Sequence, residues 1–194
     1  MAALTEIGQI GVTDAEGNYF LFNPSFENIA KIGNPKEIVQ YFHWLHNERM
    51  CLLAAMRVMH SCCEHDIYDD MLVGWIDGNK DSATFDQRID GSIPDGELVI
   101  LARSLMTDGI AGRAKPTGKS EEGKYSDSFD ASEFVDAAMV HLGTSAADAW
   151  KLTMTQFQRQ IEMKFPAKNK VDMTEDQYKK AKAELMAKRE KAGL

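Results

Sequence analysis

The residues best suited to chemistry lie in one short run, His60-Ser-Cys-Cys-Glu-His65. Imidazole, thiolate and carboxylate groups are zinc ligands, and His60 could share a helix face with Cys63 or Glu64. A structural zinc site usually takes four ligands from two separated pairs, and no second pair of the Cys-x-x-Cys kind is present. We therefore interpret the cysteines as small buried apolar residues and predict neither a metal nor a cofactor. A metal-dependent enzyme at His60 and Cys63 is the weaker alternative.

Two further segments resemble ion- or phosphate-binding loops, but each departs from the required pattern. Gly112–Ser120 has five residues between its glycines where a phosphate loop has four, and we expect a helix before it instead of a strand. Asp77–Arg88 has the alternating oxygen ligands of a calcium loop, but Ser82 replaces the glycine and Arg88 replaces the closing glutamate. No Gly-x-Ser-x-Gly elbow is present either. The sequence therefore predicts that the protein is not an enzyme.

Residues 134–165 could form a helix-turn-helix, with one helix over Phe134–Leu142 and a second over Thr155–Phe165. Four side chains of the second helix could reach base edges: Gln156, Gln158, Arg159 and Gln160. That helix carries only Arg159 and Lys164 as cations, whereas a groove-reading helix usually has more support from phosphate contacts. A packed helical module is favoured, and a small DNA-binding regulator is the alternative.

The charge is divided unevenly along the 194 residues. Residues 151–194 hold 11 Lys and Arg against 6 Asp and Glu, a local charge of +5. The whole chain holds 22 and 30, so residues 1–150 hold 11 and 24, a local charge of -13. An acidic body excludes coating of nucleic acid by the whole chain.

Two further observations concern the compartment. The chain contains neither an apolar stretch of transmembrane length nor a recognisable secretory signal. Its three cysteines do not indicate a disulfide framework. We therefore expect no membrane partner and a reduced, cytoplasmic setting.

The fold class predicted from the pattern of apolar residues is mainly α, with an N-terminal β-hairpin and a C-terminal helical extension. The hairpin is expected from strands at 9–13 and 19–22 joined by turn residues. A helix over 25–32 should end at Gly33 in the left-handed conformation, and Asn34-Pro35 should begin the next. The apolar run at 48–65 predicts a central buried helix, and the Gly- and Asp-rich residues 74–93 predict an exposed loop.

The second half of the chain is expected to be helical around one polar interruption. A helix should begin at Pro94, and Gly143 should end another. Capping boxes are predicted at Asp130–Glu133, Thr153–Gln156 and Thr174–Gln177. Residues 111–128 hold almost no apolar side chain, which predicts a flexible linker. We therefore expect an N-terminal body at 1–110, the linker at 111–128, and a basic C-terminal helical module at 129–194.

Two segments of the chain together carry a family resemblance. Glu6-Ile-Gly-Gln-Ile-Gly-Val-Thr13 followed by Tyr19–Gly33 resembles the opening of tail assembly chaperones from long-tailed (siphovirus-type) bacteriophages. Ala149–Pro166 resembles a short segment common in the downstream part of the same chaperones, and Ile100–Met106 fits less distinctively. The resemblance touches most of the chain, through pattern-level matches, and includes no catalytic motif.

The resemblance implies a non-enzymatic role in viral tail assembly. Such chaperones coat the long, helical tape measure protein in the host cell cytoplasm before the tail tube polymerises around it, and they are not kept in the mature virion. In several of these phages a frameshifted longer product recruits tail tube subunits. In this sequence both kinds of segment occur in one reading frame. The chain could therefore be the short form, the frameshifted long form or a single product. The implied partners are the tape measure protein and the tail tube protein, and a homo-oligomer is compatible.

Particular residues can be assigned under this hypothesis. We expect Phe26, Ile29 and Ile32 to be structural anchors of the N-terminal body. The eleven methionines would supply adaptable contact surface, although a methionine-rich core is the simpler interpretation. The residues expected at a partner interface lie in the downstream segment: Trp150, Phe157, Arg159, Ile161 and Phe165. For Trp150, Phe157 and Ile161 the core is the alternative.

Overall fold

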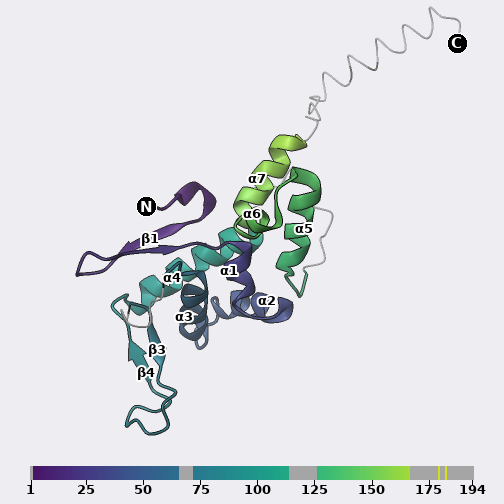
Figure 1. The fold of residues 1–194 in the computed structure, drawn as a ribbon. Helices are drawn as coiled ribbons and strands as arrows, with labels where there is room; N and C mark the ends of the chain where they lie inside the picture. The colour runs from purple at the N-terminus through teal and green to yellow at the C-terminus, as the bar shows by residue number, and fades with distance from the viewer. Residues whose placement is uncertain (1, 66–71, 114–125, 167–178, 180–181, 183–194) are drawn as a thin grey trace, which may run out of the picture.

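Thirteen short elements make up the part of the chain described by the computed structural model, which covers residues 2–65, 72–113, 126–166, 179 and 182 (Figure 1). In order they are η1 (Thr5–Ile7), β1 (Ile10–Thr13), β2 (Tyr19–Phe22), α1 (Phe26–Ala30), α2 (Pro35–Trp44), α3 (Cys51–Cys62), β3 (Gly74–Ile76), β4 (Arg88–Asp90), α4 (Asp95–Met106), the π-helical turn η2 (Thr107–Ala111), α5 (Ala131–Leu142), α6 (Ala146–Trp150) and α7 (Met154–Lys164). The predicted fold class is confirmed. Within these residues, no helix is both long and apolar enough to cross a membrane.

The N-terminal hairpin forms where the sequence predicts it. β1 and β2 are antiparallel, with Ile10 opposite Phe22 and Thr13 opposite Tyr19. The Asp14 carboxylate closes the turn by accepting hydrogen bonds from the backbone N–H and the side-chain amide of Asn18, at 2.7 and 2.8 Å. The other edge of β2 runs beside the residues that follow α3, where the Glu64 N–H donates to the Leu21 carbonyl at 2.8 Å. The hairpin is therefore attached to the helical body.

Helix starts are predicted better than helix ends. Asn34 caps α2 in a capping box with Glu37, and Pro35 occupies the first turn, as expected. The expected left-handed cap at Gly33 is wrong, because α1 ends at Lys31 in a right-handed conformation and Gly33 has no positive φ. Gly33 instead gives the Glu37 side chain room to lie against the backbone, where a Cβ would overlap it.

The expected exposed loop at 74–93 is partly wrong, because its two ends pair as a second hairpin. β3 and β4 are antiparallel, with Trp75 opposite Ile89. Gly74 has φ +81°, and a Cβ there would overlap the carbonyl of Ile89, so a glycine is needed for the close approach of the strands. Residues 77–87 between the strands, and 91–93 after them, lie outside helices and strands.

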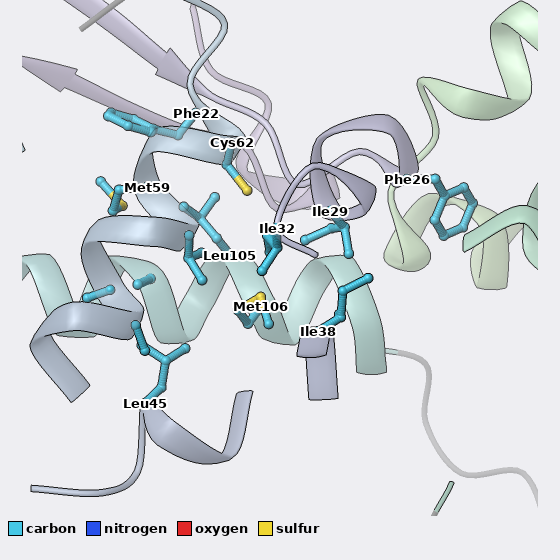
Figure 2. Packing of buried hydrophobic residues seen from close by; sticks show 14 of the residues in the cluster. Phe22, Phe26, Ile29, Ile32, Ile38, Leu45, Met59, Cys62, Leu105 and Met106 are labelled. Atoms are coloured by element: carbon cyan, nitrogen blue, oxygen red, sulfur yellow. The ribbon is translucent and has the colours of Figure 1, made fainter. Parts of the chain in front are cut away.

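The core lies between α3 and α4, with α1 and the N-terminal hairpin packed beside them. α3 is largely buried, as predicted for a central helix. Phe26, Ile29 and Ile32 are fully buried or nearly so, which confirms their predicted role as anchors. Figure 2 shows Ile32 beside Leu105 and Met106 of α4, and Cys62 of α3 close to Phe22 of β2.

The C-terminal helices join the same core through a group of phenylalanines. Phe26 of α1 stacks on Phe134 of α5, with ring centroids 5.8 Å apart, and meets Phe157 of α7 edge-on at 6.2 Å. Phe129 stacks on Phe134 at 5.2 Å, and its N–H donates to the Pro35 carbonyl at 2.9 Å. α5, α6 and α7 therefore pack directly on the N-terminal body.

Two sequence predictions fall largely or wholly outside the described residues. Most of the linker expected at 111–128 lies in 114–125, which the structure does not describe. The capping box expected at Thr174–Gln177, and the helix expected after it, also lie outside. The other two predicted capping boxes have different outcomes. Thr153 and Gln156 form the predicted capping box of α7, whereas Asp130 caps α5 only by accepting a hydrogen bond from the Ser132 N–H.

We predict that Thr153→Ala will lower the free energy of unfolding by roughly 1–3 kcal/mol, because one buried hydroxyl serves two segments. The Thr153 Oγ1 accepts from the Gln156 N–H at 3.2 Å and donates to the Ile7 carbonyl at 2.8 Å. Urea denaturation of the full chain measures the change. Thr153→Ser keeps the hydroxyl and is the matched control, so equal stability of the Ala and Ser variants would contradict the prediction.

Candidate functional site

The two segments on which the predicted family resemblance depends, at 6–33 and 149–166, lie side by side in the fold. The N–H of Phe26 donates to the carbonyl of Leu152 at 2.9 Å, and Ser25 and Thr153 form an isolated antiparallel bridge. The Thr153 hydroxyl adds a hydrogen bond to Ile7, 146 residues earlier in the chain. Packing of the Phe26 and Phe157 rings continues the contact into the core. One structural unit therefore contains both segments.

A cleft of about 770 Å³ opens where these segments meet, and we call it the β2–α1 cleft. It lies between the N-terminal turn, the face of β2 opposite the core, α1, and the start of α7. Its lining consists of Leu4, Ile7, Gln9, Tyr19, Leu21, Asn23, Ser25, Glu27, Asn28, Lys31, Glu64, His65, Lys151 and Gln156. All of these residues except Leu4, Glu64 and His65 belong to the two resembling segments.

One part of the cleft is a connected polar network. The Glu64 Oε1 accepts hydrogen bonds from the side-chain amides of Asn23 and Asn28, each at 3.1 Å. The Lys31 ammonium donates to the Asn28 Oδ1 at 2.7 Å and lies 3.8 Å from the Glu27 carboxylate. These bonds hold the charged groups in place. Neighbouring donors and acceptors beside apolar residues suit the binding of an amphipathic segment.

A smaller pocket of about 540 Å³ adjoins the cleft, and we call it the Trp150 pocket. Its lining is Glu27, Ala30, Lys31, Ala147, Trp150 and Lys151, of which Glu27, Lys31 and Lys151 also line the cleft. Ala30 of α1 and Ala147 of α6 leave room beside the half-buried Trp150 ring. The pocket can therefore accept one apolar side chain next to a positively charged rim.

A buried carboxylate fixes the wall of the cleft from behind. Asp108, in η2, is fully buried; its Oδ1 accepts from the Thr155 hydroxyl at 2.8 Å and its Oδ2 from the Arg113 guanidinium at 2.7 Å. Gly8 of the N-terminal turn packs against the same side chain so closely that a Cβ would overlap it. The position of Ile7 and Gln9 in the cleft therefore depends on Asp108.

The five residues predicted at a partner interface are not brought together. Trp150 lines its pocket, whereas the Phe157 ring lies against Phe26 and Phe134 in the core. The Arg159 Nη1 donates to the Glu6 carbonyl at 3.3 Å, and Ile161 is half-buried. Phe165 is 55% exposed at the end of α7, with its ring edge-on to His141.

Sequence reasoning did not predict the polar network of the cleft, and it named Glu64 only as a possible zinc ligand. Asn23, Asn28 and Glu64 come from the end of β2, from α1 and from the segment after α3, and no spacing rule connects them. The one local signal is Asn28, an asparagine on the buried side of a short apolar helix, where an unsatisfied amide would be costly.

The residues of the DNA-binding alternative make contacts within the chain. Gln156 closes the capping box of α7, and the Gln158 amide donates to the Ala111 carbonyl at 2.7 Å. Arg159 contacts Glu6 in the N-terminal turn. Gln158 and Arg159 therefore join α7 to the rest of the fold, whereas Gln156 closes the start of its own helix.

The residues of the metal alternative are used in packing. The His60 Nε2 lies 2.9 Å from the Gly74 carbonyl, and the His65 N–H donates to the Cys63 sulfur at 3.4 Å. Cys62 is fully buried, and this burial raises the pKa of its thiol. Across residues 2–65, 72–113 and 126–166, no three His, Cys, Asp or Glu side chains converge as a metal site would require.

The calcium-like segment is the loop between β3 and β4. The Asn79 N–H donates to the Asp77 Oδ1 at 2.9 Å, and the Thr84 hydroxyl donates to Oδ2 at 2.6 Å. Hydrogen bonds from the Thr84 and Ser82 hydroxyls lower the pKa of Asp77. The Asp77 oxygens are therefore engaged in the loop's own hydrogen bonds.

Comparison with known proteins gives one family match. A family model described as a family of unknown function (DUF6246) matches residues 22–51 and 47–180, which is well over half of the chain. Searches of the curated proteins and of the solved structures find no match. The matched residues include α1, Glu64 and α6, and therefore much of the cleft and all of the Trp150 pocket.

We predict that Gly8→Ala will lower the free energy of unfolding by roughly 2–4 kcal/mol, from backbone strain and from overlap with Asp108. Gly17→Ala is the matched control, because Gly17 has nearly the same φ, +88° against +90°, but has nothing within 4 Å of the position that a Cβ would occupy. Its loss should be roughly 1–2 kcal/mol, from backbone strain alone. Urea denaturation of both variants separates the two contributions, and equal losses would show that the packing on Asp108 does not matter.

Proposed function

We propose that this chain, which belongs to the DUF6246 family of unknown function, is a non-enzymatic tail assembly chaperone of a long-tailed bacteriophage. It binds the tape measure protein in the host cell cytoplasm and helps to recruit tail tube subunits, and it is absent from the mature virion. The observation that carries the proposal is the β2–α1 cleft. The two segments that resemble these chaperones, separated by more than a hundred residues, supply most of its lining.

The chemistry of the cleft supports the binding of an amphipathic helix. Leu4, Ile7 and Leu21 offer apolar surface, and the network around Glu64 and Asn28 offers polar contacts beside it. An α-helix has the same division between an apolar and a polar face, and helix-in-groove binding uses a few apolar anchors along one face. A long helical partner presents many such segments, so a cleft of modest size suits repeated binding along it.

The uneven charge supports two separate tasks. The acidic residues of 1–150 keep the methionine-rich body soluble and away from nucleic acid. The excess of basic residues in 151–194 suits a second partner with an acidic surface. The proposal assigns the tape measure protein to the cleft and the tail tube protein to the basic segment.

We predict that co-expression with the tape measure protein of the same phage will increase its soluble yield and that the two proteins will co-purify. The physical reason is that the cleft would cover apolar helical surface that otherwise aggregates. Affinity purification through a tag on this chain, followed by quantification of the captured partner, is the measurement. If the partner neither co-purifies nor gains solubility, the proposed function is wrong.

A charge placed in the cleft tests whether the partner binds there. Leu4 is 53% exposed at the cleft, so Leu4→Glu should leave the fold intact and reduce capture of the tape measure protein at least about ten-fold. Ile100→Glu is the matched control, because Ile100 is a 64% exposed aliphatic residue on α4, away from the cleft. Equal capture by both variants would place the binding surface elsewhere.

A further inference from the structure

The second hairpin projects from the body as an arm, formed by Gly74–Asp90. Figure 1 shows β3, β4 and their loop at the lower end of the molecule, whereas α6 lies toward the opposite end. The arm carries two large apolar side chains that are nearly half exposed, Ile76 at 45% and Phe85 at 46%. An exposed aromatic side chain on a projecting hairpin can serve as the anchor of a contact between proteins.

The loop that carries Phe85 is held in one conformation by its own hydrogen bonds. The Asp77 carboxylate bonds Asn79 and Thr84, and the Ser82 and Thr84 hydroxyls lie 2.8 Å apart. Asp86, next to Phe85, has a positive φ of 59°, and its N–H donates to the Asp77 carbonyl at 2.7 Å. Phe85 is therefore presented by an ordered loop, which reduces the entropy lost on binding.

The Trp150 pocket has the size and the surface to receive such a side chain. Ala30 and Ala147 leave its apolar part open beside the Trp150 ring. Lys31 and Lys151 stand at its rim; Lys31 is paired with Glu27, whereas Lys151 forms no ion pair with any described residue. One cation at the rim is therefore available to a partner.

The charges of the arm complement this rim. The loop at 77–87 contains three aspartates, Asp77, Asp81 and Asp86, and one cation, Lys80. The Arg88 guanidinium at the base of the loop is already bonded to Asp95, at 2.6 and 3.0 Å, and to Asp90 at 3.0 Å. The end of the arm is therefore an aromatic side chain within a net negative loop, and the pocket is an apolar recess beside a lysine that forms no ion pair with the described residues.

We propose that the arm of one copy of this chain binds a second copy, with Phe85 in the Trp150 pocket and the loop carboxylates beside Lys151. Because the arm and the pocket are formed by different parts of the chain, Gly74–Asp90 for the arm and the α1 and α6 regions for the pocket, the contact joins copies head to tail and leaves one free arm and one free pocket at the ends. The assembly requires only this chain. It does not depend on the proposed function, which concerns the larger cleft.

The test is the mass of the full chain in solution, measured by sedimentation and light scattering from micromolar to about millimolar concentration. The weight-average mass of the unmodified chain should rise above the 21.7 kDa of one copy as concentration increases. Phe85→Ala should remove the rise, because the arm loses its anchor. Phe165→Ala is the matched control, since Phe165 is an exposed phenylalanine outside both arm and pocket, and it should assemble like the unmodified chain.

A mixing experiment distinguishes head-to-tail contact from symmetric pairing. Ala147→Glu fills the pocket and places a carboxylate facing the arm, at an exposed position in the first turn of α6, where helix formation favours acidic residues. This variant alone should stay at one copy. Mixed with Phe85→Ala it should form a one-to-one complex of twice the mass and nothing larger, since each variant keeps one intact half of the contact.

The proposal is overturned if the unmodified chain stays at one copy throughout this range, or if Phe85→Ala assembles as well as Phe165→Ala. It is also overturned if the two monomeric variants do not combine. Should Ala147→Glu instead reduce capture of the tape measure protein while the unmodified chain is monomeric, the pocket belongs to that partner and not to a second copy. Each of these results leaves the proposed function to be judged separately, through Leu4→Glu.

Discussion

The buried carboxylate of Asp108 is the constraint on which the rest of the structure depends. Removing a charge from water costs several kcal/mol unless the charge is paired and hydrogen-bonded. Here the Thr155 hydroxyl and the Arg113 guanidinium satisfy it, and Gly8 allows the N-terminal turn to pack against it. One side chain thus fixes η2, α7 and the start of the chain relative to one another, and with them one wall of the β2–α1 cleft.

The phenylalanine group completes this arrangement on the apolar side. Phe26 contacts Phe134 and Phe157, so α1 cannot be placed without α5 and α7. The cleft therefore exists only when early and late parts of the chain fold together. This is the physical basis for treating the cleft as one binding site, with a separate role for the contact between the arm and the Trp150 pocket.

The sequence determined most local features, because their hydrogen bonds join residues a few positions apart. The hairpin at 10–22, the Asn34–Glu37 and Thr153–Gln156 capping boxes, the Gly143 helix end and the buried central helix all follow from nearby residues. Gly33 was assigned the wrong role because its purpose is close approach to Glu37, a matter of packing that a turn signal does not reveal. The second hairpin was missed because strands of only three residues, Gly74–Ile76 and Arg88–Asp90, are too short to show an alternating pattern among the surrounding glycines and aspartates.

The candidate site, in contrast, depends mainly on contacts between residues far apart in the sequence. By itself the sequence determined which residue types are present, the uneven charge and the segments that resemble a chaperone family. Only the tertiary structure decided that residues as far apart as Leu4 and Gln156 line one cleft and that Phe157 packs against the core. It also decided that the arm and α6 lie toward opposite ends of the molecule. The reason is that long-range contacts arise from burial and shape, which depend on every packed element together, whereas composition and spacing report only on neighbours along the chain.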